Sequence, residues 1–525
     1  MKEITIRKKY LIFPVNTYGK CKRVKFSLKD EAVYRLQIKL DAFSPDFFAY
    51  VDMSRFMGET LSIDIAPYVE VEIGESDTMD IPNLYREPMR PTVHFTTKNG
   101  WLNDPNGLIW LDGTYHMFYQ HNPCEPNWEN MHWGHATSPD LLHWTEHDPV
   151  LHPDNGGLMY SGSAILDTEN LLGLQVDEHP VPLLFYTSTK PFVQNIAYST
   201  DGFRTVHKYK GNPVLPRIIH GNRDPKVVFC EELNAYVMAL FLKGQNNETY
   251  ALLKSKNLVD WVEIQRIEMP GENECPDFFC LRAPNGEKKW VLMGARNRYL
   301  VGDFKRGRFV PCQSILGLQY SSRDYAGQTF SNMPDGRVVR MTWDRWTLHT
   351  PPFSGQMGVP MELRLEQKES TYLIVVHPIR ELETLVQGNV EMEDVILGEE
   401  PTAIPLEDQA VWIKLSGHYE SDGILSLQIF GIPLSLDFDK GCLIGEKNKE
   451  LAPISLFRDR FEMQILVDRC STEVFLDGGR VFSCLSEPAY VPDRNLPTLS
   501  LRSTRPMTLN RLTVSSLASI HEAKT

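Results

Sequence analysis

The chain has 525 residues, more than one ordinary domain holds, so two or three domains are expected. Hydrophobic residues make up 42% of it and charged residues 23%, as in soluble globular proteins, and no apolar run approaches the about 20 residues that span a bilayer. The formal net charge of −14 argues against nucleic acid and anionic membranes as partners, because both favour a basic surface.

The first residues and the cysteines both bear on the compartment. The chain starts with basic residues and a very short apolar stretch, whereas a secretory signal needs an apolar core of about 7–15 residues. The 9 cysteines are odd in number and form no Cys-x-x-Cys pair, which favours reduced thiols over a disulfide framework. We therefore expect a cytoplasmic protein.

The N-terminal region, residues 1–88, is predicted to be a small accessory β region. Strand-like runs occur at Val24–Leu28, Tyr34–Leu40 and Leu61–Ile65, and the acidic stretch Glu70–Asp80 resembles a linker. We expect this region to pack against the rest of the chain, and carbohydrate binding and oligomer contacts are the alternatives.

Residues 89–368 contain a repeated pattern of short apolar runs bounded by turn residues. A second repeat relates Ser138–Trp144 to Ser255–Trp261, two segments that are predicted to be turns leading into a strand. Repeats of roughly 50 to 70 residues are typical of the four-stranded blades of a β-propeller, and five runs predict five blades. The five runs are Thr114–Tyr119, Leu183–Thr187, Ala235–Leu240, Lys289–Gly294 and Arg337–Trp343.

Residues 369–525 predict a C-terminal β-sandwich, because short strands with alternating apolar residues follow one another between turn signals. A short helical piece is expected at Glu381–Gln387. The predicted strands are Tyr372–Val376, Ala410–Leu415, Leu425–Phe430, Phe461–Val467, Thr472–Leu476 and Leu509–Val514.

Three carboxylates stand in unusual local sequences. Asp104 lies in Trp101-Leu-Asn-Asp-Pro-Asn-Gly107, where Pro105 disfavours helix at Asp104 and the Asn-Gly pair favours a tight turn. This pattern predicts an acid held rigidly at the end of a strand. An Asx-turn that closes a hairpin is the alternative interpretation.

The other two carboxylates also precede or neighbour a proline. Asn222-Arg-Asp-Pro225 sets an arginine beside Asp224, which an ordinary surface ion pair would also explain. Glu274 lies in Glu272-Asn-Glu-Cys-Pro-Asp-Phe-Phe279, where apolar neighbours could desolvate it and raise its pKa, as a general acid near neutral pH requires. An exposed loop with ordinary glutamates is the alternative.

The same end of every propeller blade faces the central channel, so acids far apart in the sequence can converge there. Two carboxyls with a third that stabilises charge suit glycoside hydrolysis. Metal binding is the competing use of three acids, but no His-Glu-x-x-His pattern occurs, and Asp437-Phe-Asp439 lies far away in the C-terminal region. We expect neither a metal nor a cofactor.

These segments, in this order, resemble glycoside hydrolase family 32, which contains invertases, inulinases, levanases and sucrose-6-phosphate hydrolases. The resemblance covers roughly residues 90–515 and implies a five-bladed β-propeller followed by a β-sandwich. Its strongest motifs are Trp101–Gly107, Tyr119–Pro123, Asn130–Ala136, Ser161–Ala164, Arg223–Pro225, Glu274–Cys275, Tyr325–Phe330 and Asp468–Phe475.

The resemblance also implies roles for individual residues. Asp104 matches the nucleophile, Glu274 the acid/base, and Asp224 the transition-state stabiliser that holds two sugar hydroxyls, with Arg223 beside it. Positions that line a fructose pocket are implied at Asn103, Gln120, Trp128, Ser161 and Trp343.

The implied activity is retaining hydrolysis of terminal non-reducing β-D-fructofuranosyl residues in sucrose or fructo-oligosaccharides, by way of a covalent fructosyl-enzyme. A small sugar is then the expected partner, and formation of a homo-oligomer is left open. A fructosyltransferase of the same fold, including one that closes a difructose anhydride, is the alternative. A non-catalytic sugar-binding propeller is disfavoured, because it predicts the loss of a carboxylate and all three are present.

Overall fold

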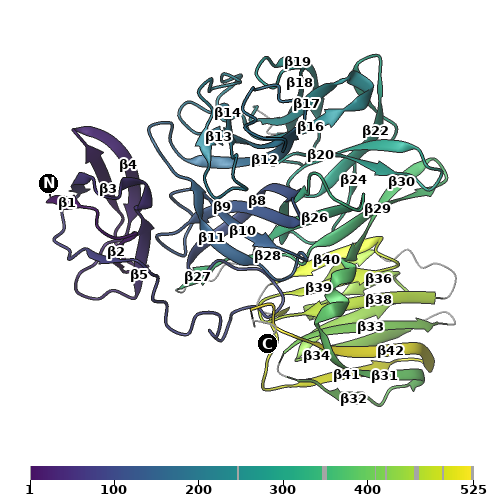
Figure 1. Cartoon of the computed structure of the whole chain (residues 1–525). Coiled ribbons are helices and arrows are strands. Elements are labelled where there is room, and N and C mark those ends of the chain that lie inside the picture. The colour runs from purple at the N-terminus through teal and green to yellow at the C-terminus, as the bar shows by residue number, and fades with distance from the viewer. Residues whose placement is uncertain are drawn as a thin grey trace.

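The computed structural model describes residues 2–244, 248–345, 352–407, 409–419, 423–453, 460–486 and 490–521. Nearly all of its regular structure is β-strand, which confirms the predicted all-β class (Figure 1). The helical segments among these residues are short 3-10 turns: η1 (Ser54–Phe56), η2 (Glu231–Leu233), η3 (Arg380–Leu385) and η4 (Glu446–Asn448). None of the described helices is long and apolar enough to cross a membrane.

The N-terminal region contains two small sheets, ordered β1-β6-β3-β4 and β5-β2-β7, around a core of their own. The predicted runs at residues 24–28, 34–40 and 61–65 fall in β3, β4 and β6, although β4 ends at Ile38. The linker prediction is wrong at Gly74–Ser76, because β7 pairs with β2 there. The strands are β1 (Lys2–Thr5), β2 (Tyr10–Val15), β3 (Lys22–Leu28), β4 (Glu31–Ile38), β5 (Phe47–Asp52), β6 (Thr60–Ala66) and β7 (Gly74–Ser76).

The described residues in the middle of the chain form five sheets in chain order, which begin with β8, β12, β16, β20 and β25 and are antiparallel apart from the pair β27–β8. The strands of the first three sheets are β8 (Gly100–Leu111), β9 (Thr114–Asn122), β10 (His132–Ser138), β11 (Thr145–Leu151), β12 (Met159–Asp167), β13 (Val181–Ser188), β14 (Val193–Tyr198), β15 (His207–Lys208), β16 (Arg223–Cys230), β17 (Ala235–Leu242), β18 (Thr249–Ser255) and β19 (Val262–Glu268).

The remaining strands are β20 (Asp277–Arg282), β21 (Lys288–Met293), β22 (Arg298–Lys305), β23 (Arg308–Pro311), β24 (Leu316–Gly317), β25 (Asp324–Thr329), β26 (Val338–Asp344), β27 (Phe353–Ser354), β28 (Gln356–Met357), β29 (Met361–Lys368) and β30 (Thr371–Pro378). Strand β27 pairs with β8 and so ties the end of the repeat to its beginning.

The first strands of the five sheets form a ring of contacts: β8 contacts β12, β12 contacts β16, β16 contacts β20, β20 contacts β25, and β25 returns to β8. Each of the five predicted apolar runs lies in the second strand of a sheet, namely β9, β13, β17, β21 and β26, apart from the end residues Gly294 and Arg337. The number of propeller blades itself stays a prediction.

The second predicted repeat is confirmed in atomic detail. Leu141 and Leu258 both adopt a left-handed backbone conformation, with φ of 69° and 67°. The indole N–H of Trp144 donates to the carbonyl of Leu141 at 2.9 Å, and that of Trp261 donates to Leu258 at 2.9 Å. The same turn conformation thus precedes an edge strand in two different sheets, β11 and β19.

The C-terminal strands form two six-stranded sheets, ordered β31-β42-β33-β38-β39-β40 and β32-β41-β34-β35-β36-β37, which share one apolar core as a sandwich does. The strands are β31 (Val386–Leu397), β32 (Thr402–Pro405), β33 (Ala410–His418), β34 (Ile424–Ile429), β35 (Ile432–Asp437), β36 (Cys442–Ile444), β37 (Glu450–Pro453), β38 (Arg460–Val467), β39 (Thr472–Leu476), β40 (Val481–Leu485), β41 (Thr498–Ser503) and β42 (Met507–Leu517).

One predicted sandwich strand belongs elsewhere. Tyr372–Val376 lies in β30, which pairs with β29 in the fifth middle sheet, so its assignment to the sandwich is wrong. The predicted boundary at residue 369 falls in the turn of that hairpin, and alternation alone could not reveal it because both sheets use the same strand pattern. The predicted helical piece Glu381–Gln387 is confirmed as the 3-10 segment η3 up to Leu385, but its last two residues lie in β31.

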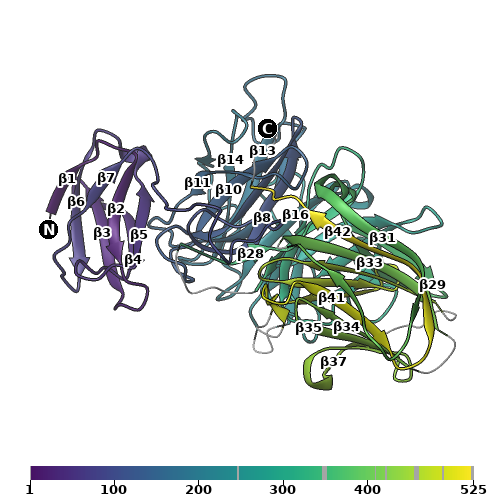
Figure 2. The ribbon, with the colours of Figure 1, turned by 90° about the horizontal axis from the view of Figure 1, so that it is seen from below.

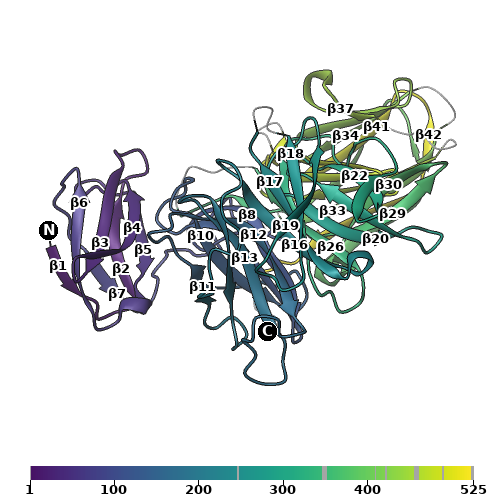
Figure 3. The ribbon, with the colours of Figure 1, turned by 90° about the horizontal axis from the view of Figure 1, so that it is seen from above.

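A buried polar cluster, His94, Asp468 and Glu473, joins the segment before β8 to the C-terminal sheets. We call it the joint cluster. Asp468 accepts the backbone N–H of Val93 and the Nδ1 of His94, both at 2.8 Å, and Nε2 of His94 lies 3.3 Å from Glu473. The N-terminal region and the sandwich lie on different sides of the middle sheets (Figure 1, Figure 2 and Figure 3).

Candidate active site

Backbone irregularities at the starts of the first strands place most of the predicted site residues. The pairing register shifts between Leu102 and Pro105 in β8, between Tyr160 and Gly162 in β12, and between Arg223 and Lys226 in β16. A β-bulge of this kind re-aims side chains, and a proline favours one because it cannot donate to the ladder. Asp104, Ser161 and Asp224 occupy these three shifts.

Asp104 is buried and receives two side-chain donors. The hydroxyl of Ser161 donates to its Oδ2 at 2.8 Å, and Sγ of Cys275 lies 3.3 Å from the same oxygen. Strands β8 and β12 and the loop before β20 therefore meet at one carboxylate.

Asp224 has a left-handed backbone, with φ of 65°, and is 2% exposed. Its backbone N–H donates to Thr187 Oγ1 at 3.1 Å, and its Oδ2 accepts the backbone N–H of Cys275 at 3.1 Å. A left-handed aspartate costs free energy that the surrounding contacts must offset, and such strain clusters at functional sites. Pro225 follows directly and has no N–H to donate, so it cannot continue a regular strand ladder at this point.

Glu274 and Cys275 lie in the loop before β20, both with positive φ, 38° and 33°. The loop is held from behind: the hydroxyl of Tyr250 lies 2.9 and 3.0 Å from the carbonyls of Asn273 and Glu274. Buried Glu272 also accepts the backbone N–H of Arg296 at 2.9 Å. The strained loop is thus fixed to the neighbouring strands.

The Glu274 side chain is about a third exposed, at 32%, so it reaches the open side of the site. Its Oε1 accepts Asn273 Nδ2 at 2.7 Å and the hydroxyl of Tyr325 at 3.4 Å. Arg223 connects the two acids, since Nη2 lies 3.5 Å from Glu274 Oε2 and Nε lies 3.6 Å from Asp224 Oδ2. The three predicted carboxylates therefore lie around Cys275, and two of them, Asp224 and Glu274, share Arg223.

Burial is the main influence on the acids. It raises the pKa of Asp104, the charge of Glu274 adds to this, and hydrogen bonds from Ser161, Asn103 and Cys275 oppose it. Burial likewise raises the pKa of Asp224 to about 7, although the guanidinium of Arg223 lowers it. These two carboxyls gain protons more readily than surface acids do, and perturbed pKa values of this kind cluster at functional sites.

The polar pocket residues surround this cluster. Asn103 precedes Asp104 and accepts the indole N–H of Trp101 at 2.8 Å. Gln120 in β9 is buried and donates to the carbonyl of Met159, just before Ser161, at 2.9 Å.

The two predicted tryptophans lie on different parts of the rim. Trp128 is 47% exposed, and its ring meets Tyr160 edge-on at 6.3 Å. Trp343 packs near Cys275, with its ring 6.2 Å from Tyr325 and 5.8 Å from Trp101. Its buried indole N–H has no hydrogen-bond partner among the residues that the structure describes, so it can donate to a ligand.

Sequence reasoning assigned no contact role to Cys275, Asn273 or Tyr325. The structure places Cys275 between Asp104 and Asp224, and places Asn273 and Tyr325 on Glu274. Two of them neighbour the predicted acid/base in the sequence. Tyr325 comes from β25, fifty residues away, so only its motif pointed to it.

Asp224, Glu274 and Cys275 each place one possible metal ligand within 4.8 Å of the others. The chemistry of these groups fits a metal poorly. The Arg223 guanidinium already lies beside both carboxylates. Burial, helped by the charges of Asp104, Asp224 and Glu274, raises the pKa of Cys275 well above its usual range, so the thiol keeps its proton.

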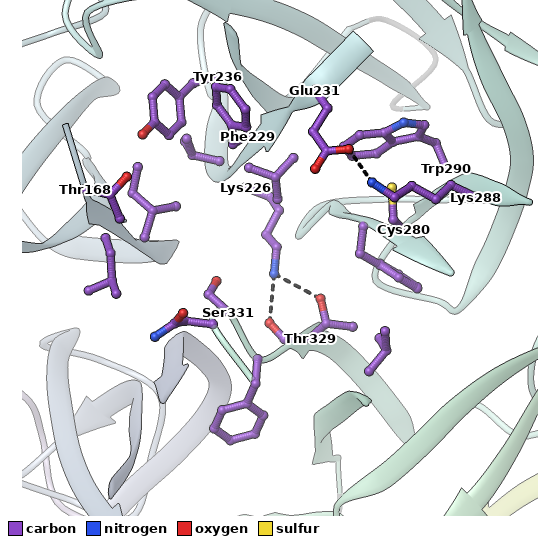
Figure 4. Close-up of a pocket in the computed structure, with 18 of the residues that line it drawn as sticks. Thr168, Lys226, Phe229, Glu231, Tyr236, Cys280, Lys288, Trp290, Thr329 and Ser331 are labelled. Carbon is purple, nitrogen blue, oxygen red and sulfur yellow. Dashed lines mark hydrogen bonds and ion pairs between the residues drawn. The ribbon is translucent and has the colours of Figure 1, made fainter. Parts of the chain in front are cut away.

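A separate cavity of about 520 Å³ lies farther along the same first strands, where β12, β16, β20 and β25 supply Ile165, Phe229, Cys280 and Thr329 (Figure 4). Lys226 points into it in the figure, but its ammonium donates to the carbonyl of Thr329 at 2.9 Å and pairs with Asp277 at 2.9 Å. None of the predicted site residues lines this cavity.

Residues 94–378 match the family model described as the glycosyl hydrolases family 32 N-terminal domain. The levanase of Bacillus subtilis (strain 168) is 31% identical over 477 residues, which cover 80% of this chain and 69% of the levanase. The invertase of Schizosaccharomyces pombe is 31% identical over 397 residues, which cover 69% of this chain and 66% of the invertase.

Two solved structures show the same fold. The exo-inulinase from Aspergillus awamori superposes with a TM-score of 0.73 at 23% identity, over 83% of this chain and 99% of the inulinase. The β-fructofuranosidase from Schwanniomyces occidentalis, complexed with fructosyl-erythritol, gives 0.72 at 23% identity, over 82% of this chain and 98% of that one.

Proposed function

This chain belongs to glycosyl hydrolase family 32 and is a glycosidase, and we propose that it releases terminal non-reducing β-D-fructofuranosyl residues from sucrose or fructo-oligosaccharides with retention. One observation carries the proposal: Asp104, Asp224 and Glu274 come from three different sheets or loops and meet around Cys275. Relatives named levanase, invertase and sucrose-6-phosphate hydrolase support the substrate class.

The first half of the reaction would break the glycosidic bond. Glu274 donates a proton to the leaving oxygen while Asp104 Oδ1 or Oδ2 attacks the anomeric carbon, and the alcohol departs with that proton. A fructosyl ester on Asp104 results. Retaining pairs stand about 5–5.5 Å apart, close enough for direct attack with no water between them.

The second half would release the sugar. Glu274, now a carboxylate, takes a proton from water, the resulting hydroxide attacks the same carbon, and Asp104 leaves as a carboxylate. Asp104 and the water attack the anomeric carbon from opposite faces. Each attack inverts this carbon, so the two steps together keep its configuration. The partly exposed Glu274 suits this step, since water can reach it.

Asp224 would stabilise the oxocarbenium-like transition state by accepting hydroxyl groups of the furanose. Hydrogen bonds to an anion tighten as positive charge develops on the sugar. The positive charge of Arg223 lowers the pKa of Asp224 and so opposes part of the effect of burial. Asn103, Gln120 and Ser161 would fix the remaining polar groups, because all three are buried around Asp104.

We also propose that the five middle sheets are the blades of a five-bladed propeller, which the closed ring of contacts among β8, β12, β16, β20 and β25 supports. Trp128 and Trp343 would then wall the sugar at the mouth of the central channel. A cytoplasmic setting is proposed as well, and the absence of disulfides among the 9 cysteines supports it.

A panel of sucrose, kestose, inulin, levan and sucrose 6-phosphate tests the function. We expect fructose release from at least one of them by the wild type and none by Asp104→Asn. The glucose-to-fructose ratio at high sucrose decides between hydrolysis and the transferase alternative, because transfer leaves less free fructose than glucose. Failure to cleave any fructoside would contradict the proposal.

A further inference from the structure

The segment that carries Trp128, residues 122–132, connects β9 to β10 and lies against the N-terminal region. Strands β4 and β5 of that region face β10 and β11 (Figure 2 and Figure 3). Trp128 is 47% exposed, so packing around its own side chain does not fix it. Its position therefore depends on the backbone to either side.

Two residues anchor the segment before Trp128. Cys124 is fully buried and belongs to the apolar core of the N-terminal region. Glu125 accepts the backbone N–H of Lys39 at 2.5 Å, and its other oxygen lies 3.3 Å from the Lys39 ammonium. That ammonium also donates to the carbonyl of Thr17 at 2.8 Å. The Glu125 carboxylate is nearly buried, which makes these bonds strong.

A third residue anchors the segment after Trp128. Asn130 Oδ1 accepts the backbone N–H of Gln37 at 2.7 Å, and Asn130 Nδ2 donates to the Gln37 carbonyl at 2.7 Å. Gln37 lies in β4, the edge strand of its sheet, so the Asn130 amide pairs with it as another strand would. The same Nδ2 also donates to Asn122 at 3.2 Å.

We infer that the N-terminal region positions Trp128 against the substrate and so acts as part of the sugar-binding pocket. This inference rests on the proposed function, in which Trp128 walls the fructose. Anchors on both sides of the tryptophan hold it in place before the sugar arrives, which removes an ordering cost from binding. A wall contacts the bound sugar before and during reaction alike, so loss of the anchors should raise KM and leave kcat nearly unchanged.

A double-mutant cycle tests the inference. Glu125→Ala is expected to raise KM for the best substrate of the panel about fivefold, and Trp128→Ala to raise it at least as much, with kcat within about twofold of the wild type in both. Because Glu125 acts through Trp128, adding Glu125→Ala to Trp128→Ala should raise KM no further. Additive effects, or an unchanged KM in Glu125→Ala, would overturn the inference.

Two further variants keep the test decisive. Arg35→Ala removes a contact between the same two regions, the 3.1 Å bond to Asn155, without touching the Trp128 segment, and its KM should stay at the wild-type value. Glu125→Gln keeps an acceptor for Lys39 but loses the charge, and it replaces the alanine variant if that variant does not fold. Its KM should rise about twofold in the wild-type background and should not rise further in the Trp128→Ala background. A KM rise of equal size in Arg35→Ala would overturn the inference.

The cycle separates the two proposals. A wild-type chain that cleaves no fructoside overturns the proposed function, and the inference with it. If the wild type is active and Glu125→Ala leaves KM unchanged, the inference is overturned and the proposed function stands.

Discussion

Two clusters of this molecule each combine aspartate, glutamate and a basic side chain, and they shift the pKa of a buried aspartate in opposite directions. In the joint cluster, burial alone would raise the pKa of Asp468, but the hydrogen bond and charge of His94 and the N–H groups of Thr92 and Val93 hold it far below its usual range. In the active site, burial wins, and the pKa of Asp224 rises to about 7.

The pKa of His94, the basic member of the joint cluster, is also shifted against the effect of burial. Burial alone would lower its pKa, but the charge of Glu473 and the hydrogen bonds to Asp468 and Glu473 raise it to about 10. The joint cluster therefore holds a satisfied ion pair, which joins two parts of the fold. The active site instead places one arginine, Arg223, beside Asp224 and Glu274. Burial there leaves Asp104 and Asp224 with raised pKa values, as is common at functional sites.

The largest expected difference between the clusters is in turnover. Glu274→Gln should lower kcat on sucrose by about 10²–10⁴-fold, the usual contribution of a positioned general acid, and Asp104→Asn should nearly abolish turnover. Both variants should fold, because Asn and Gln match Asp and Glu in shape and keep an acceptor oxygen for the same donors. Steady-state rates and a thermal melt of each variant measure this. Undiminished activity in either would refute the assignment.

Asp468→Asn should show the reverse behaviour. It breaks a buried ion pair and leaves His94 with one acidic partner, which should lower the free energy of unfolding by about 3 kcal/mol. The folded fraction should turn over at the wild-type kcat. Thermal melting measures the stability, and rates normalised to the folded fraction measure the turnover. A variant that is stable but inactive would contradict the view that the joint cluster serves the fold and not the reaction.

Asp224→Asn tests the sign of the pKa shift in the active site. Between about pH 4 and pH 7 the unfolded chain has already lost the Asp224 proton while the folded chain keeps it, so the wild type loses stability as pH rises through this window. Asparagine cannot ionise, so from pH 5 to pH 8 the variant should gain about 2 kcal/mol relative to the wild type. Melts of both proteins at the two pH values measure the difference. An equal difference at both would mean that Asp224 titrates normally.

Ser161→Ala should have the smallest effect. Losing one hydrogen bond to a buried carboxylate should cost about tenfold in kcat/KM. The Ser161 hydroxyl lowers the pKa of Asp104, so its removal should also move the acidic limb of the kcat/KM profile to higher pH. An unmoved limb would show that Asp104 does not set it.

The fold was largely predictable because its repeats are visible in apolar runs. Each run lies in the second strand of a middle sheet, which is buried along nearly its whole length and is therefore rich in apolar residues. The edge strands β11 and β19 carry mixed polar sequences and could not be recognised in this way. The sequence predicts the wrong sheet for strand Tyr372–Val376, because the residues of a strand do not indicate that β29 is its partner.

The candidate site was predictable where proline marks a strained acid, as at Asp104 and Asp224. It was not predictable where a contact depends on the ring of strands, as for Tyr325 on Glu274. The anchors Glu125 and Asn130 were missed for the same reason: their partners, Lys39 and Gln37, lie in a region that the family motifs do not reach.

The covalent fructosyl ester on Asp104 is the central claim, and trapping it is the most direct test. β-D-Fructosyl fluoride needs no acid for departure of its leaving group, so Glu274→Gln should form the ester and then release it slowly. Mass spectrometry of the quenched, digested protein should find one anhydrofructose unit on the peptide with Asp104, and none in Asp104→Asn/Glu274→Gln. An adduct on another peptide, or an unmodified Asp104 during turnover with inversion, would contradict the account.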